Sequence, residues 1–148
     1  MSASAPDEPG VFVLRHVVGP HEIDELRHAS NVRYLAWIMD AATAHSEAWG
    51  WPSSRYLELG AAWVVRKHEL RYLRSALEGD ELDVQTWVSD VRKASCLRHY
   101  RVLRGAEVLL MASTSWAFID LARGVPTRIP EPLASQVQAI ARPAEPPT

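Results

Sequence analysis

The spacing of hydrophobic and polar positions changes once along this chain, and the change separates a helical region from strands. Residues 11–18 are mostly β-branched and apolar, which predicts a first strand that ends at Gly19. Over residues 31–49, apolar side chains recur every three or four positions, which predicts one helix of about 18 residues. Ser30 or Asn31 can cap its start, and Gly50 supplies the stop.

Beyond a loop at residues 52–60, the pattern is typical of strands. β-branched and aromatic residues, or alternating apolar and polar ones, occupy segments 61–73, 82–88, 97–103 and 108–121. The short connections favour an antiparallel meander, and residues 130–140 are expected to form a closing helix. One long helix against an antiparallel sheet predicts an α+β architecture.

Composition fits one ordinary globular domain. The chain has 148 residues, of which 47% are apolar and 23% charged. Its net charge of -2 gives no overall basic field that would recruit nucleic acid. Both ends are rich in Pro and Ala, so we expect flexible tails at residues 1–10 and 142–148 around a domain at residues 11–141.

The same composition narrows the chemistry. Cys96 is the single cysteine, which excludes an internal disulfide and a zinc site built from thiolates. No signal peptide or run of about 18 apolar residues occurs, so we expect a cytoplasmic protein without a membrane span. The nucleophile elbow, the phosphate-binding loop and the dinucleotide fingerprint are missing, and His16, His21 and His28 lack metal-ligand spacing. We therefore predict no metal and no cofactor.

Ionisable groups gather in residues 21–30, just before the predicted helix. The start of a helix leaves backbone N–H groups without partners and carries a partial positive charge, so it can polarise a carbonyl docked there. A carboxylate a few residues upstream can then activate water or attack that carbonyl. Asp24 fits this role, and Glu22 and Glu25 compete with it on chemistry alone.

Three motifs in order resemble the 4-hydroxybenzoyl-CoA thioesterase family. The stretch Asp24-Glu-Leu-Arg-His28-Ala-Ser-Asn31-Val-Arg-Tyr34-Leu35 is similar to the family's D-x-x-G-H-x-N-N-x-x-Y-L pattern. Residues 72–82 are similar to its Y-x-R-P-A-x-x-G-D-x-L segment, and residues 116–130 to its closing strand and Ile-Pro ending. The resemblance extends from residue 11 to residue 140.

This resemblance implies a hot-dog fold, in which a curved antiparallel sheet of about five strands wraps a long central helix. It implies a homodimer or homotetramer with active sites between subunits, and hydrolysis of an acyl-CoA or acyl-carrier thioester, with CoA as part of the substrate. Asp24 takes the place of the catalytic aspartate, and Asn31 stands where a backbone N–H meets the thioester carbonyl. Arg92, Lys93 and Ser95 match a basic turn that lies near CoA.

Two positions depart from the family pattern, and both concern substrate contact. Arg27 replaces a glycine that would permit a positive φ, and Ser30 replaces the first asparagine of the Asn-Asn pair. Arg27 can narrow the site or contact an anionic part of the substrate. Tyr34 is a core or interface aromatic residue that can also line an acyl pocket.

Each of these residues also has a plainer interpretation. Asp24 can be a solvated acid near a helix dipole, His28 a structural histidine, Ser30 and Asn31 ordinary caps, and Arg92 with Lys93 a solvated turn. Two other functions remain open. A hot-dog enoyl-CoA hydratase or dehydratase has its histidine five residues after the aspartate, whereas the spacing from Asp24 to His28 is four. The other is a non-catalytic acyl-CoA-binding protein, which Arg27 would explain.

Overall fold

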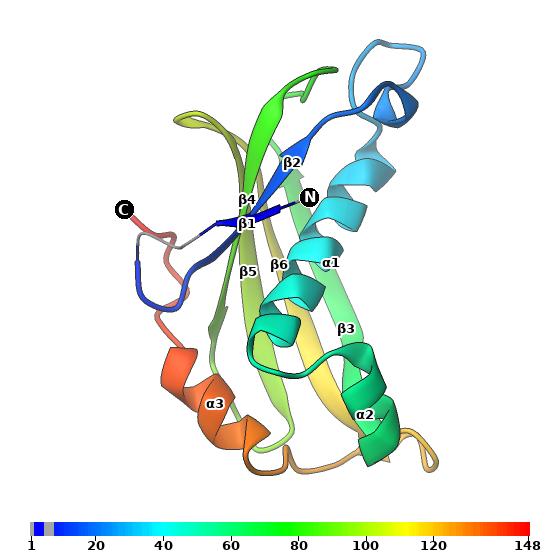
Figure 1. Cartoon of the computed structure of the whole chain (residues 1–148), viewed down its shortest axis with the longest axis vertical. Helices are drawn as coiled ribbons and strands as arrows, with labels where there is room; N and C mark the ends of the chain where they lie inside the picture. The colour runs from blue at the N-terminus through cyan, green and yellow to red at the C-terminus, as the bar shows by residue number, and fades with distance from the viewer. Residues whose placement is uncertain (1, 5–7) are drawn as a thin grey trace.

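A curled antiparallel sheet wraps one long helix, α1, in the computed structural model, which describes residues 2–4 and 8–148 (Figure 1). The helices are α1 (Asn31–Ala48), α2 (Ser53–Leu59) and α3 (Leu133–Ile140), and a 3-10 turn, η1, covers Pro20–Glu22. The strands are β1 (Ser2–Ser4), β2 (Phe12–Val17), β3 (Ala61–Tyr72), β4 (Glu81–Ser89), β5 (Ser95–Arg104), β6 (Glu107–Asp120) and β7 (Val125–Pro126). The predicted α+β hot-dog fold is confirmed.

The order of the sheet corrects one expectation. The strands run β1-β2-β4-β5-β6-β3, with β7 paired to β6, and every pairing is antiparallel. A full meander would pair β3 with β4, but β3 pairs with β6 instead. The segment between β3 and β4 crosses near the start of α1, where the amide of Ala76 donates a hydrogen bond to the Tyr34 hydroxyl (2.8 Å). The curl of the sheet brings the end of its edge strand β3 close enough to the interior strand β4 for this short connection.

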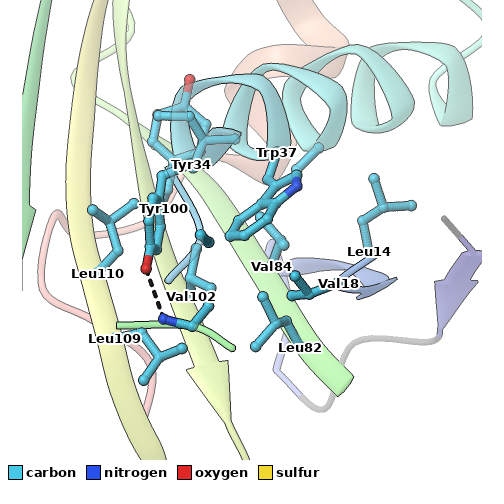
Figure 2. Packing of buried hydrophobic residues seen from close by; sticks show 14 of the residues in the cluster. Leu14, Val18, Tyr34, Trp37, Leu82, Val84, Tyr100, Val102, Leu109 and Leu110 are labelled. Atoms are coloured by element: carbon cyan, nitrogen blue, oxygen red, sulfur yellow. Dashed lines mark hydrogen bonds between the residues drawn. The ribbon is translucent and has the colours of Figure 1, made fainter. Parts of the chain in front are cut away.

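Helix α1 buries one face against the sheet and has the predicted length of 18 residues. Tyr34 and Trp37 lie over Leu82, Val84 and Val102 (Figure 2). Full burial of each large apolar side chain contributes about 1.5–3 kcal/mol, so this face holds the helix in place. The helix ends at Ala48, and Gly50 follows its C-cap residue with a φ of 87°, the left-handed conformation that glycine adopts easily.

Helix α2 occupies a segment that the sequence analysis treated as a loop. It begins after Pro52 and ends at Gly60, whose φ is 79°. Its seven residues make barely two turns, too few for a hydrophobic period to show. Tyr56 of this helix is buried in a second cluster with Trp51 and Phe118, at the C-terminal end of α1. The predicted closing helix is present as α3, and its Leu133 and Val137 join this cluster.

Both end segments of the chain contact the sheet. Strand β1 pairs with β2, an element that the sequence did not predict; residues 1 and 5–7 of the expected N-terminal tail lie outside the described residues. In the expected C-terminal tail, the Arg142 amide donates to the Val88 carbonyl (2.9 Å), and the Arg101 side chain donates to the Pro147 carbonyl (3.0 Å). That these tails are flexible stays a prediction.

Across the described parts of the chain, the helices are too short or too polar for any of them to cross a membrane.

Candidate active site

The loop that carries Asp24 is a tight turn closed by backbone hydrogen bonds. The Asp24 amide donates to the His28 carbonyl (2.9 Å), and the Arg27 amide donates to the Asp24 carbonyl (3.0 Å). A β-bridge between Ile23 and Ala29 holds the two sides of the turn together. Arg27 has a φ of 65°, so it takes the left-handed conformation that the family's glycine would permit, at a strain of about 1–2 kcal/mol.

The Asp24 carboxylate is partly free. Its Oδ1 accepts a hydrogen bond from the Leu26 amide (2.9 Å), which fixes the side chain. Among the described residues nothing else donates to it, and the residue is exposed. His28, four positions later, is also exposed, and its ring makes no side-chain hydrogen bond within the described chain. The turn therefore presents a carboxylate and an imidazole outward.

The start of α1 lies directly after this turn and has free donors. Ser30 is the N-cap residue by its extended backbone, but its hydroxyl makes no capping hydrogen bond. The backbone N–H groups of Asn31 and Val32 find no acceptor in the described chain, and Val32 is 72% exposed. The capping role considered for Ser30 is thus not filled, and the positive end of the helix is open to a ligand.

A hollow of about 370 Å³ connects the turn with the helix start. Tyr34 forms its buried wall, and Tyr72 packs against Tyr34 edge-on with ring centroids 5.3 Å apart. The Tyr72 hydroxyl donates to the Asn31 carbonyl (3.3 Å), which ties the end of β3 to the helix start. Burial raises the pKa of Tyr34, so its hydroxyl stays neutral. The residues that line the hollow include Asp24, His28, Asn31, Tyr34, Tyr72 and Arg74.

Glu22 lies beneath the turn as a buried anchor. Its side chain is 6% exposed, and its carboxylate contacts His16 Nε2 (2.6 Å) and accepts hydrogen bonds from Trp37 Nε1 (2.6 Å) and the Gly19 amide (3.0 Å). Burial raises the pKa of Glu22, but these hydrogen bonds outweigh it and leave the pKa below its usual value. Because its carboxylate is already bonded to these three groups, Glu22 is a poor alternative to Asp24 as the catalytic carboxylate.

The structure brings together only part of the predicted site. Arg27 and Glu25 are exposed and do not line the hollow, and Ser30 is half-buried beside it. Arg92, Lys93 and Ser95 belong to the turn between β4 and β5, where the Arg92 amide donates to the Ser95 carbonyl (2.8 Å). Strand β4 begins opposite Val17 and extends for nine residues, about 30 Å, to this basic turn, and none of these three residues lines the hollow.

Sequence reasoning missed two contributors to this region. It quoted Tyr72 and Arg74 only as parts of a motif, yet both line the hollow. The available signal was their position in the chain. They lie at the end of β3 and just after it, and β3 ends near the start of α1. In the described ranges 2–4 and 8–148, no group of three His, Cys, Asp or Glu side chains is placed to hold a metal ion.

Known proteins resemble this chain in sequence pattern and in fold. A family model for the thioesterase-like superfamily matches residues 18–137. A probable thioesterase from Bartonella henselae is 22% identical, with 81% of this chain and 99% of that one covered and a TM-score of 0.75. No curated protein sequence matches the chain.

Two further structures show the same fold. A hypothetical protein from Thermus thermophilus is 23% identical, with 86% of this chain and 98% of that one covered and a TM-score of 0.81. A 1,4-dihydroxy-2-naphthoyl-CoA thioesterase from Synechocystis is 17% identical, with 87% and 96% covered and a TM-score of 0.81. At these identities the structures establish the fold alone, while the family match confirms the resemblance found in the sequence at the level of a hot-dog thioesterase family.

Proposed function

We propose that this chain, which belongs to the thioesterase-like superfamily and is a thioester hydrolase, cleaves acyl-CoA thioesters with Asp24 as its catalytic carboxylate. One observation carries the proposal: a partly free carboxylate and the open backbone N–H groups of a helix start lie on the same hollow. The solved neighbours that act on aromatic CoA thioesters, such as 1,4-dihydroxy-2-naphthoyl-CoA and gentisyl-CoA, support CoA as the carrier.

The chemistry follows from that geometry. The thioester oxygen accepts hydrogen bonds from the N–H groups of Asn31 and Val32, which stabilise the negative charge that forms on attack. Asp24 takes a proton from water as the water oxygen bonds to the carbonyl carbon. The C–S bond then breaks, the CoA thiolate leaves, and the proton on Asp24 passes to it. His28, on the same hollow, orients the water or the substrate. Neither a metal nor a cofactor takes part in this proposal.

A second copy of the chain would complete the site. Strand β3 ends the sheet, and its outer edge has no partner strand in the described chain. Its exposed side chains include Val64 and Tyr72, and the unpaired edge suits an antiparallel partner. Pairing of two β3 strands about a two-fold axis would place the start of one strand beside the end of the other. The exposed hollow near Tyr72 would then be covered by the second copy, as a homodimer or a homotetramer built from such dimers requires.

The other residues predicted to contact the substrate would reach it in the same dimer. Because the two copies run in opposite directions, the basic turn with Arg92, Lys93 and Ser95 on one copy moves toward the hollow of the other, where CoA phosphates would lie. Arg27, at the rim of the turn, is proposed to contact an anionic part of the substrate. We also place the protein in the cytoplasm, a proposal that rests on its single cysteine and on its substrate.

Thiol release from a panel of thioesters tests the proposal. The panel holds aromatic and aliphatic acyl-CoAs and an acyl-carrier thioester, and the wild type is compared with Asp24→Asn and with Glu25→Gln as a matched control. We expect Asp24→Asn to lower kcat about 10²–10⁴-fold, because Asn still accepts from the Leu26 amide but cannot take a proton. Glu25→Gln should keep its activity.

Three outcomes would contradict the proposal. Equal turnover by Asp24→Asn would remove Asp24 from the mechanism. Hydration of an enoyl-CoA without thiol release would identify a hydratase. Tight binding of acyl-CoA without turnover of any thioester would identify a binding protein. A crystal soaked with a non-hydrolysable CoA analogue would then show whether Arg27 and the basic turn contact the ligand.

A further inference from the structure

Arg98 is a buried cation without an acidic partner. It lies on β5 in the run of inward-facing residues that includes Cys96 and Tyr100, and it is 5% exposed. It forms no ion pair with any residue in the described ranges 2–4 and 8–148. Buried charges in proteins are normally paired, because an unpaired charge is costly to remove from water. A cation left in this state calls for an explanation.

The hydrogen bonds of Arg98 use only one edge of its guanidinium group. Its Nη1 lies 2.9 Å from His45 Nδ1 and donates to Thr86 Oγ1 at 2.9 Å. Burial and the charge of Arg98 lower the pKa of His45 to about 2, so the imidazole is neutral and its Nδ1 accepts this hydrogen bond. Nε and Nη2 make no hydrogen bond with a described residue. These two groups form the edge through which arginine binds carboxylates in a bidentate manner.

Arg98 lines a cavity of about 270 Å³ at the C-terminal end of α1. Five aromatic residues line it: Trp49, Trp51, Tyr56, Trp63 and Trp116. No aspartate or glutamate lines it, so the wall offers no anion of its own to Arg98. Dry cavities of roughly 150 Å³ already bind benzene. This one has room for a single ring or a short alkyl chain.

The cavity wall carries a further donor without an acceptor. The indole nitrogen of Trp49 is buried and makes no hydrogen bond in the described chain, whereas the indole nitrogen of Trp116 faces the Tyr100 hydroxyl. Buried polar groups nearly always find a partner, so an idle N–H group beside an unpaired cation indicates a missing acceptor. The site provides donors and positive charge, and it needs an acceptor that bears negative charge. The neighbouring Cys96 thiol is not a nucleophile, because burial raises its pKa to about 11.

We propose that this cavity, which we call the Arg98 cavity, binds a carboxylate carried on a small aromatic or alkyl body. The carboxylate lies against Nε and Nη2 of Arg98, and the body fills the space between the tryptophans. Such a ligand pairs the buried charge and offers an acceptor to the idle Trp49 indole.

The Arg98 cavity is distinct from the Asp24 hollow within one chain. Ser46, on the cavity wall, follows Asn31 by 15 residues of α1, which corresponds to about 22 Å along the helix. The carboxylate can therefore come from two sources. It is either the far end of an acyl group that enters from the hollow of a second copy, or a separate acid. The inference about binding itself does not depend on the proposed hydrolase mechanism.

Direct binding to the wild-type protein is the first test. Benzoate and hexanoate are titrated against their neutral amides, benzamide and hexanamide, and followed by tryptophan fluorescence and calorimetry. We expect saturable binding of the acids, at least about tenfold tighter than that of the amides, because a charge-assisted bidentate contact is lost in the amide. Equal affinity for acid and amide, or no binding of any of the four compounds, would overturn the proposal.

Variants locate the binding. Arg98→Met should weaken benzoate about tenfold or more and leave benzamide unchanged, whereas Arg101→Met, on the opposite face of the same strand, should bind benzoate as the wild type does. If Arg98→Met does not fold, Arg98→Lys retains the charge without the bidentate edge and should weaken benzoate to a smaller extent. Unchanged benzoate affinity in the folded Arg98 variants would place the ligand elsewhere and refute the assignment.

Turnover then identifies the source of the carboxylate. If it belongs to the acyl group, Arg98→Met raises KM for glutaryl-CoA but not for valeryl-CoA. If it is a separate acid, added benzoate changes the turnover of valeryl-CoA by the wild type and has no effect on Arg98→Met. If the wild type binds benzoate but hydrolyses none of the thioesters, the proposed function is refuted while the inference about the Arg98 cavity is retained.

Discussion

The two ends of helix α1 hold their charged groups in different surroundings. At its N-terminal end, Asp24, His28 and Asn31 are exposed on an open hollow, and their support is hidden below them in Glu22 and Tyr34. At its C-terminal end, the charged group itself is buried, and several aromatic side chains line the cavity beside it.

The two ends differ in what each lacks. At the N-terminal hollow the groups proposed to react are exposed, and a second copy covers them in the proposed dimer. The Arg98 cavity is lined by α1, α2, α3 and the sheet of the same chain, and no carboxylate lines it to pair with the arginine. Each of the following substitutions is expected to affect the N-terminal end and leave benzoate binding at the C-terminal end unchanged.

Glu22→Gln should have the largest effect. It replaces a buried carboxylate that contacts His16 and accepts from Trp37 and Gly19, so we expect a loss of about 2–4 kcal/mol in the free energy of unfolding. Thioester turnover should fall as well, because the Asp24 turn loses its anchor. Denaturant unfolding and thiol release measure the two effects. Unchanged stability and turnover in Glu22→Gln would mean that the backbone hydrogen bonds alone hold the turn.

The same residue predicts a pH dependence. The pKa of folded Glu22 lies below its unfolded value of 4.5, so its contribution to stability is complete above that pH and is lost as the pH falls through the lower folded value. Unfolding curves below pH 4.5 should therefore show a larger acid loss in the wild type than in Glu22→Gln. Parallel curves would show that Glu22 has the same pKa in both states.

Tyr34→Phe should have an intermediate effect. The ring remains packed on Tyr72, but the buried amide of Ala76 loses its acceptor, which costs about 1–3 kcal/mol. The segment between β3 and β4 forms part of the hollow, so we expect KM to rise more than kcat falls. Thermal unfolding and steady-state kinetics distinguish this from a purely structural role, in which both kinetic constants would stay as they are.

Arg27→Gly should have the smallest effect, and it should be stabilising. Glycine takes the φ of 65° without strain, but it also loses more conformational freedom on folding, so the net gain is about 0.5 kcal/mol. The melting temperature should rise by about 1–2 °C. A simultaneous rise in KM would identify Arg27 as a substrate contact, whereas an unchanged KM would show that its side chain stays clear of the substrate.

Local patterns predicted the elements, and long-range contacts decided their arrangement. The period of α1 and the alternation in β4 and β5 are properties of neighbouring residues, and the sequence predicted these elements within a few residues. The pairing of β3 with β6 depends on curling of the whole sheet, which no local pattern records. Helix α2 and strand β7 were missed because they are too short to show a period.

The candidate site divides in the same manner. The motif around Asp24 pointed to the turn before α1, and the structure shows that turn beside open helix donors. Arg98 was missed because an arginine in a strand is usually assigned to the surface. The signal was available, since Arg98 falls in phase with Cys96, Tyr100 and Val102, all of which face the core. Its partners His45 and Thr86 come from elements far along the chain, so no spacing rule could join them.

Glu8 connects the two ends of the chain. Its carboxylate pairs with Arg142 at 3.0 Å and accepts a hydrogen bond from the Thr148 hydroxyl at 2.6 Å. Residues 8 and 148 therefore lie in contact. A linker that joins these two positions directly, in place of residues 1–7, would close the chain into a ring, and the exposed turn at Arg92 and Lys93 offers a place to open that ring again. The order of the strands along the chain could thus be changed while their order in the sheet stays the same.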